Sequence, residues 1–320
     1  MSQMHPVSDQ TRGRGGRTAE AGRLPNLFIA GVTRGGTTSL FGYLGQHPDI
    51  CPSDIKELRY FTPLRYGLEV EPLPTYTRHF TDCEDRRYAL EATPGYFYGG
   101  HRTAQAIETT CPDSRIMVSL RSPADRCWSW FRFVKNRLRI PEDMDFDAYL
   151  DRCEELHRAG EDGALENQPF AGMLGGCYAD WMDAWTETFG SRLKLMFFDD
   201  LVADPRAVVR QLCEWLALDA AVVADLSFEA DNQTQVYRNK GLQRLAVAAN
   251  RRSERFFRRH MWLKRRLRSG YFLLNSAAPT GGMPAAARER LNAFYAPYNC
   301  RLAEQLAGVG LAIPESWAAS

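Results

Sequence analysis

A short apolar run that ends in a glycine-rich turn and opens a helix constrains the fold of this 320-residue chain more than any other feature. Residues 24–32 read LPNLFIAGV, and residues 37–48 place Leu40, Tyr43 and Leu44 at helical spacing. A strand, a loop and a helix in this order present unpaired backbone N–H groups and the positive end of a helix dipole to an anion. The stretch therefore predicts a phosphate-binding junction in an α/β protein.

The loop itself, GVTRGGTT, nearly matches the nucleotide-binding pattern G-x-x-x-x-G-K-[ST]. Gly31 and Gly36 have the required separation, but Thr37 stands where that pattern has its lysine. A tight turn with a helix cap would explain the glycines equally well. If the loop binds phosphate, the candidate contacts are Arg34, Gly35, Gly36, Thr37, Thr38 and Ser39.

Two further apolar runs, at residues 115–120 and 193–200, precede predicted helices at about 123–135 and 204–216. This alternation predicts a parallel sheet that is covered by helices on both faces. More helices are expected near residues 101–110, 146–159, 176–189 and 284–307. Because no linker divides the chain, we expect one domain at residues 25–320.

The second strand-to-helix junction reads RSPADRCWS at residues 121–129. Arg121 is predicted at the carboxyl end of its strand, where open parallel sheets bind ligands, and Ser129 on the helix that follows. A guanidinium fork and a hydroxyl suit a second phosphate group. Taken alone, the two residues would also fit a surface ion pair and a neutral helix position.

Charge and cysteine content exclude several classes of partner. Forty basic and 39 acidic side chains give a net charge of +1, so no overall field recruits nucleic acid, and we expect none as a partner. Eight cysteines without a C-x-x-C pair or clustered histidines argue against a metal site and a disulfide scaffold. We therefore expect reduced thiols, no metal and a cytoplasmic protein. Residues 1–24 have four arginines but no apolar segment, which predicts a disordered basic arm.

Two phosphate sites at strand ends, the first without its lysine, resemble those of sulfotransferases that use 3′-phosphoadenosine 5′-phosphosulfate. GVTRGGTTSLFGYLGQHPDI at 31–50 is similar to the family's 5′-phosphosulfate loop. RIMVSLRSPADRCWSWF at 115–131 is similar to its 3′-phosphate segment, with the pattern L-R-x-P-x-x-R-x-x-S complete. Other similar segments are LEATPGYF (90–97), GGCYADWMDAW (175–185), FFDDLVADP (197–205) and YAPYNCRLAEQL (295–306). The resemblance covers roughly residues 25–306.

The resemblance also implies catalytic roles. KELRYF at 56–61 is similar to the segment of the heparan sulfate sulfotransferase branch and its bacterial relatives in which a glutamate is the base, which points to Glu57. Arg34 stands where the family usually has lysine or arginine, so it would stabilise charge on the leaving phosphate. Because arginine does not give up its proton, it would act by electrostatics and not as an acid. If Glu57 is not the base, the next candidates are His47, His79 and His101.

The chain departs from the animal enzymes at two places. Ala92 replaces the lysine of their E-K-[ST]-x-x-Y-F segment, and their K-G-R loop for the 3′-phosphate is not evident. Arg238 and Lys240 could supply that phosphate contact, although a solvated surface pair fits them better. The departures make a sulfated polysaccharide acceptor less expected than a small molecule, lipid or sugar.

Residues 251–268, RRSERFFRRHMWLKRRLR, contain nine basic side chains and one acidic one. A basic amphipathic helix here could border the acceptor site or touch a membrane, or simply pack with a solvated face. The sequence thus predicts a single-domain α/β protein with a P-loop-like parallel sheet that transfers a sulfuryl group to a hydroxyl or amine. The alternatives are a nucleoside-triphosphate kinase, which needs the absent lysine and Mg²⁺, and a nucleotide-binding module without catalysis.

Overall fold

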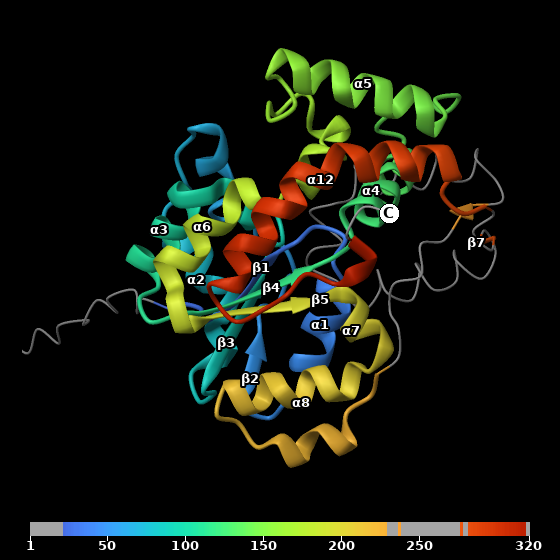
Figure 1. Cartoon of the computed structure of the whole chain (residues 1–320). Coiled ribbons are helices and arrows are strands. Elements are labelled where there is room, and N and C mark those ends of the chain that lie inside the picture. The colour runs from blue at the N-terminus through green and yellow to red at the C-terminus, as the bar shows by residue number, and fades with distance from the viewer. Residues whose placement is uncertain (1–21, 229–235, 238–275, 278–280, 318–320) are drawn as a thin grey trace, which may run out of the picture.

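The computed structural model describes residues 22–228, 236–237, 276–277 and 281–317. A sheet of five parallel strands in the order β2-β3-β1-β4-β5 lies at the centre (Figure 1). Its strands are β1 (Leu27–Gly31), β2 (Ile50–Pro52), β3 (Tyr88–Ala92), β4 (Arg115–Leu120) and β5 (Leu193–Phe197). A separate antiparallel pair consists of β6 (Val236–Tyr237) and β7 (Ser276–Ala277).

The helices of the described residues are α1 (Thr37–Leu44), α2 (Pro74–Thr77), α3 (Gly100–Thr110), α4 (Pro123–Asn136), α5 (Phe146–Ala159), α6 (Ala179–Phe189), α7 (Phe198–Ala203), α8 (Pro205–Trp215) and α12 (Ala285–Ala307). Single 3₁₀ turns include η1 (Thr62–Tyr66), η2 (Arg78–Cys83), η3 (Tyr96–Gly99), η4 (Gln168–Phe170), η5 (Leu174–Gly176), η6 (Gly190–Arg192), η7 (Ala220–Asp225) and η8 (Glu315–Trp317). Within the described ranges, no helix combines the length and apolar character needed to cross a bilayer.

Both faces of the sheet are buried, because alternate side chains of each strand point to opposite sides. Phe28 and Val118 pack with α3, α6 and the end of α12 in one apolar cluster. Leu27, Ile29 and Met117 pack with α1 and α8 in a second cluster on the other face. Figure 1 shows these two groups of helices on opposite sides of the sheet. The predicted fold class, a helix-covered parallel sheet, is confirmed.

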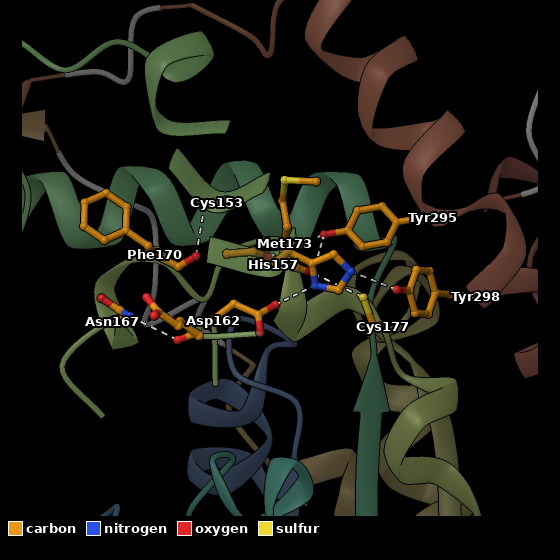
Figure 2. A network of polar contacts seen from close by, with 11 residues as sticks. Cys153, His157, Asp162, Asn167, Phe170, Met173, Cys177, Tyr295 and Tyr298 are labelled. Carbon is orange, nitrogen blue, oxygen red and sulfur yellow. Dashed lines mark hydrogen bonds and ion pairs between the residues drawn. The ribbon is translucent and has the colours of Figure 1, made fainter. Parts of the chain in front are cut away.

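A third apolar cluster joins α4, α5 and α12. A polar network accompanies this cluster, as Figure 2 shows. His157 on α5 lies between Asp162, which follows α5, and Tyr298, which is on α12. Its Nδ1 is 2.7 Å from the Asp162 carboxylate, and its Nε2 is 3.3 Å from the hydroxyl oxygen of Tyr298. The neighbouring Tyr295 hydroxyl donates to the carbonyl of Met173 at 2.8 Å. These contacts tie α12 to α5 and to Met173, while the apolar cluster packs both helices against α4, the helix that carries Ser129.

The observed elements differ from the predicted ones mainly in two strands. The sequence analysis did not anticipate β2 or β3, and the third predicted strand ends at Phe197 because α7 begins at the next residue. Strand β3 lies between β2 and β1, yet Glu91 interrupts its apolar run. A buried acidic residue hides the hydrophobic pattern by which such a strand is recognised.

The expectation that all thiols are reduced is wrong for one pair, since Cys51 and Cys83 form a disulfide. Packing of β2 against η2 brings their Cα atoms to 5.3 Å, a separation that a disulfide can span. Spacing along the chain could not reveal this contact. Most of the predicted arm lies outside the described residues, but Arg23 near its end donates hydrogen bonds to the carbonyls of Glu84 and Arg87 at 3.1 and 3.0 Å.

Candidate functional site

A cleft of about 850 Å³ opens at the carboxyl ends of the central strands. Thr33 and Arg34 after β1, Thr93 after β3, Arg121 after β4 and Phe198 after β5 all line it. Open parallel sheets bind ligands at this edge, because the loops and helix N-termini of successive units meet there. The cleft is therefore where the predicted site residues should converge.

The loop between β1 and α1 is held against β4 by its backbone. The N–H of Val32 donates to the carbonyl of Ser119 at 3.1 Å, and a Cβ at Gly35 would lie 2.4 Å from the same oxygen. Gly36 has φ +78°, a left-handed conformation that favours glycine. No side chain of the described residues caps the first turn of α1, whose Thr37 and Thr38 line the cleft. The loop thus has the geometry of an anion cradle.

Arg34 extends from this loop toward α4. Its Nε donates to the Ser129 hydroxyl at 2.9 Å, and its guanidinium lies 5.2 Å from the Phe133 ring centre. Burial, followed by the nearby charges of Arg121 and other arginines, lowers the Arg34 pKa to about 10. The side chain remains cationic at neutral pH, in a region whose excess positive charge an anion would relieve.

Arg121 completes the group at the end of β4. Its Nη1 donates to the carbonyl of Arg34 at 3.2 Å, and its guanidinium lies 4.5 Å from the centre of the Phe198 ring. The Tyr178 hydroxyl in turn donates to the Arg121 carbonyl at 2.8 Å. Arg34, Arg121 and Ser129, which the sequence analysis singled out in two separate segments, therefore form one connected set.

Arg126 is a supporting residue that the sequence analysis did not single out. It is 2% exposed, its Nε donates to the Tyr98 hydroxyl at 3.3 Å, and its Nη1 donates to the carbonyl of Gly172 at 3.0 Å. A Cβ at Gly175 would overlap its guanidinium, so this segment must approach closely. The available signal was its place as the second arginine of L-R-x-P-x-x-R-x-x-S.

Glu57 lies in the same cleft as Arg34. It has φ +68°, and its N–H donates to the carbonyl of Ala92 at the end of β3, at 3.0 Å. Its carboxylate accepts from Lys56 at 3.3 Å and from Arg59 at 3.0 Å. Burial raises its pKa, but the two cations outweigh that effect and leave the pKa below its ordinary value of 4.5. Glu57 is thus an ionised carboxylate at neutral pH, as a general base must be.

A second acid, Glu91, lies fully buried beneath this loop, and the sequence analysis missed it. The Thr93 hydroxyl donates to Glu91 Oε1 at 2.6 Å and accepts from the Arg59 N–H at 3.1 Å, so Glu91 is linked to the backbone beside Glu57. The hydroxyls of Tyr76 and Tyr96 donate to its other oxygen. Burial raises the pKa of Glu91 to about 7 although these hydrogen bonds oppose the rise.

The reserve candidates for the base lie elsewhere. His47 is buried with Nε2 3.2 Å from the carbonyl oxygen of Asp219, His79 contacts Asp54, and His101 contacts Glu187. Among the described residues that line the cleft there is no histidine. Arg238, Lys240 and the basic segment 251–268 lie outside the described residues.

Comparison with known proteins agrees with this geometry. The family model described as the sulfotransferase domain matches residues 24–265. The chain is 24% identical over 278 residues to heparan sulfate glucosamine 3-O-sulfotransferase 6 of Mus musculus. The matched region covers 87% of this chain and 70% of that protein. It is 25% identical over 201 residues to bifunctional heparan sulfate N-deacetylase/N-sulfotransferase 1 of Caenorhabditis briggsae, covering 61% of this chain but only 23% of that protein.

Among solved structures, a sulfotransferase from Alicyclobacillus acidocaldarius superposes with a TM-score of 0.64 at 24% identity. The match covers 92% of this chain and 99% of that one. At this level of identity the likeness concerns the fold, and it extends over nearly the whole of both chains.

Proposed function

Because the chain belongs to the sulfotransferase domain family, we propose that it moves a sulfuryl group from 3′-phosphoadenosine 5′-phosphosulfate to a hydroxyl or amine. The observation that supports this most directly is the single cleft that contains Arg34, Arg121, Ser129 and Glu57. Two phosphate-binding groups and a base in one cleft are what this reaction requires, since it joins a bisphosphate donor to a nucleophile.

The β1–α1 loop would hold the 5′-phosphosulfate through Gly35, Gly36, Thr37, Thr38 and Ser39, while Arg121 and Ser129 would hold the 3′-phosphate. Gly35 supports this fit, because the space that a Cβ would need is taken by the Ser119 carbonyl. Arg34, hydrogen-bonded to Ser129, would link the two phosphate sites. Arg238 and Lys240 remain candidates for a further phosphate contact.

Glu57 would remove the acceptor proton while the acceptor oxygen or nitrogen attacks sulfur. The bond between sulfur and the bridging phosphate oxygen breaks, and the bisphosphate nucleotide leaves with the bonding electron pair. Arg34 would stabilise the negative charge that builds on that oxygen. In-line alignment by the loop, and not a change in any protein bond, would provide much of the acceleration.

A kinase reaction fits the cleft less well, because Thr37 occupies the position of the lysine that holds β- and γ-phosphates. The sulfuryl donor has less charge to neutralise at this position, and we propose that no metal is needed. Excess EDTA should then leave turnover unchanged. A small molecule, a lipid or a sugar as acceptor is part of the proposal. The cytoplasmic location expected from reduced thiols stays a prediction, and the Cys51–Cys83 disulfide counts against it.

Transfer of labelled sulfate from the donor to a panel of phenols, sugars, hydroxylated lipids and small metabolites tests the reaction itself. Glu57→Gln keeps the shape of the side chain but cannot take a proton. We expect donor affinity near that of the wild type and turnover reduced by about 10²- to 10⁴-fold. Full turnover in Glu57→Gln would assign the base to another group, and donor binding without any transfer would favour the non-catalytic module.

A further inference from the structure

The cleft is lined by far more positive charge than the donor requires. Eight arginines line it among the described residues, and Glu57 is the single acidic residue in that lining. Arg34 and Arg121 belong to the donor site, Arg126 is buried in the support beneath it, and Arg59 pairs with Glu57. The remaining four are Arg65, Arg132, Arg137 and Arg139.

Arg132 belongs with the donor side of the cleft. It follows Ser129 by one turn of α4, and its charge contributes to the lowered pKa of Arg34. Its Nη2 atom is buried without a hydrogen-bond partner among the described residues. Arg132 therefore belongs with the donor or with the boundary between donor and acceptor, and not with the acceptor side of the cleft.

Arg65, Arg137 and Arg139 line the same cleft as Glu57 and Arg59, and Arg137 also lies near Arg34, because both guanidinium groups contact the Phe133 ring. Burial, and after it the charges of Arg59 and Arg137, lower the pKa of Arg139. The guanidinium groups of Arg59, Arg137 and Arg139 therefore lie near one another. Arg65 comes from the η1 turn, a few residues after Glu57, and stacks near Tyr66 and Tyr98 at 5.5 and 5.4 Å. We call Arg65, Arg137 and Arg139 the arginine wall.

Aromatic rings, and not carboxylates, lie against two members of this wall, Arg65 and Arg137. Arg137 lies 4.9 Å from the Phe133 ring centre, and the two contacts of Arg65 are also with rings. Within the described part of the chain, no member of the wall forms an ion pair. By contrast, arginines away from the cleft, such as Arg192 and Arg290, pair with glutamates. Stacking fixes the direction of a guanidinium while leaving its N–H groups free for an incoming oxyanion.

We propose that the arginine wall binds an anionic group of the acceptor, a carboxylate or a phosphate, while Glu57 receives the proton of the reacting hydroxyl or amine. The inference rests on the proposed function and names the class of its acceptor. Like charges gathered in one cleft repel one another, so an anionic acceptor would relieve the repulsion on binding. Solvated arginines with no binding role would show no preference for charge in a ligand.

The test uses matched probes on the full chain saturated with 3′-phosphoadenosine 5′-phosphate, so that the donor site is filled. The first pair is 4-hydroxyphenylacetate and its neutral amide, and the second is glucose 6-phosphate and glucose. Calorimetry should show that the anionic member of at least one pair binds about tenfold or more tightly than its neutral partner. The pair that shows the preference tells whether a carboxylate or a phosphate is recognised.

The double variant Arg65→Gln/Arg139→Gln should lose about tenfold or more of that anion affinity while the affinity for the bisphosphate nucleotide stays unchanged, and it spares Arg137, which packs on the same Phe133 ring as Arg34. The matched control is Arg158→Gln/Arg210→Gln, two exposed arginines on α5 and near the middle of α8, which removes the same charge and should change neither affinity.

Equal affinity within both pairs, or an anion preference that survives in the Arg65→Gln/Arg139→Gln variant, would overturn the inference. Sulfate transfer to neutral acceptors in that case would leave the proposed function standing. Failure of the protein to bind the bisphosphate nucleotide at all would instead count against the proposed function.

Discussion

At the scale of single residues, three members of the cleft adopt a left-handed backbone that side chains other than glycine rarely take. Arg34, Glu57 and Arg59 have φ values of 72°, 68° and 61°. Such conformations cost about 1 to 2 kcal/mol each, so they persist only where surrounding contacts compensate for them. Two of the three are the residues to which the proposed mechanism assigns catalysis. Of the six non-glycine residues with positive φ among the described residues, these three line the cleft, which supports a functional site there.

Gly35 offers a residue-scale test of the phosphate cradle. Gly35→Ala places a Cβ 2.4 Å from the Ser119 carbonyl, so the loop must move away from β4. We expect affinity for 3′-phosphoadenosine 5′-phosphate, measured by calorimetry, to fall by more than about tenfold, which corresponds to about 1.4 kcal/mol. Gly42→Ala is the control, because a Cβ there meets nothing within 4 Å. Equal affinity in both variants would mean that the donor does not touch this loop.

The pKa of Glu57 predicts the acidic side of the pH–rate profile. Because Lys56 and Arg59 hold this pKa below 4.5, turnover should stay constant on lowering the pH to about 5 and fall only below the ordinary carboxyl range. Arg59→Gln removes one cation, which raises the pKa of Glu57 and shifts this limb toward higher pH. A profile that Arg59→Gln leaves unchanged would show that the limb reports another group.

At the scale of elements, two contacts constrain the segment that carries Glu57: hydrogen bonds to the end of β3 and a nearby disulfide. Glu91 and Thr93 link β3 to the backbone of Arg59, while Cys51 at β2 is joined to Cys83 in η2. Only a few residues separate Cys51 from Glu57, so both constraints act on the same short loop. We infer that the loop depends on its neighbours for its conformation, since it contains no regular secondary structure of its own.

Removal of the disulfide should lower stability. A cross-link between residues 32 positions apart lowers the conformational entropy of the unfolded chain, which stabilises the folded state by about 3 to 4 kcal/mol. The double variant Cys51→Ala/Cys83→Ala should therefore show a lower free energy of unfolding in urea, whereas Cys300→Ala, at an exposed free cysteine, should not. If the first variant is as stable as the wild type, the disulfide does not form in the protein.

The buried Glu91 makes stability depend on pH. Its folded-state pKa of about 7 lies above the ordinary 4.5, so the folded protein binds the proton more tightly than the unfolded chain does. Stability from this group is therefore present at low pH and is lost as the pH rises from about 4.5 to 7, by on the order of 3 kcal/mol. The difference in unfolding free energy between wild type and Glu91→Gln should change across this window. A constant difference would show that Glu91 titrates in its ordinary range.

At the scale of the whole molecule, helices occupy both faces of the sheet, and the cleft opens at its carboxyl edge. The apolar clusters on the two faces and the third cluster around α4 and α12 surround this edge. Because Arg34 and Ser129 meet across segments 95 residues apart, a ligand that contacts both also ties two units of the fold together. Ligand binding should therefore raise the free energy of unfolding of the whole domain.

This linkage gives a prediction about nucleotide choice. At a concentration of one hundred times its dissociation constant, 3′-phosphoadenosine 5′-phosphate should add about 2.7 kcal/mol to the free energy of unfolding. ATP with Mg²⁺ should add much less, since Thr37 replaces the lysine that a triphosphate needs. Thermal unfolding with each nucleotide provides the measurement. Equal stabilisation by the two would favour the kinase alternative.

The sequence by itself determined the features that depend on neighbouring residues. Periodicity of apolar side chains predicted β1, β4 and most helices, and the glycines and arginines after two strands predicted where phosphates could bind. The residues proposed for catalysis came from the resemblance of short segments, and the structure places them in one cleft without testing their roles. Local patterns suffice for such features because dihedral preference and burial on one face act within a few residues.

The tertiary structure alone decided which distant segments meet. Glu91 disguised β3 in the sequence because its burial is stabilised by the hydroxyls of Tyr76 in α2 and Tyr96 in η3, which belong to other elements. The pairing of Cys51 with Cys83 and the arginine wall likewise depend on packing between separate elements. A linear pattern records which side chains are available, but electrostatic and hydrogen-bond energies depend on distances in space. Those distances are set only when the sheet and its helices assemble.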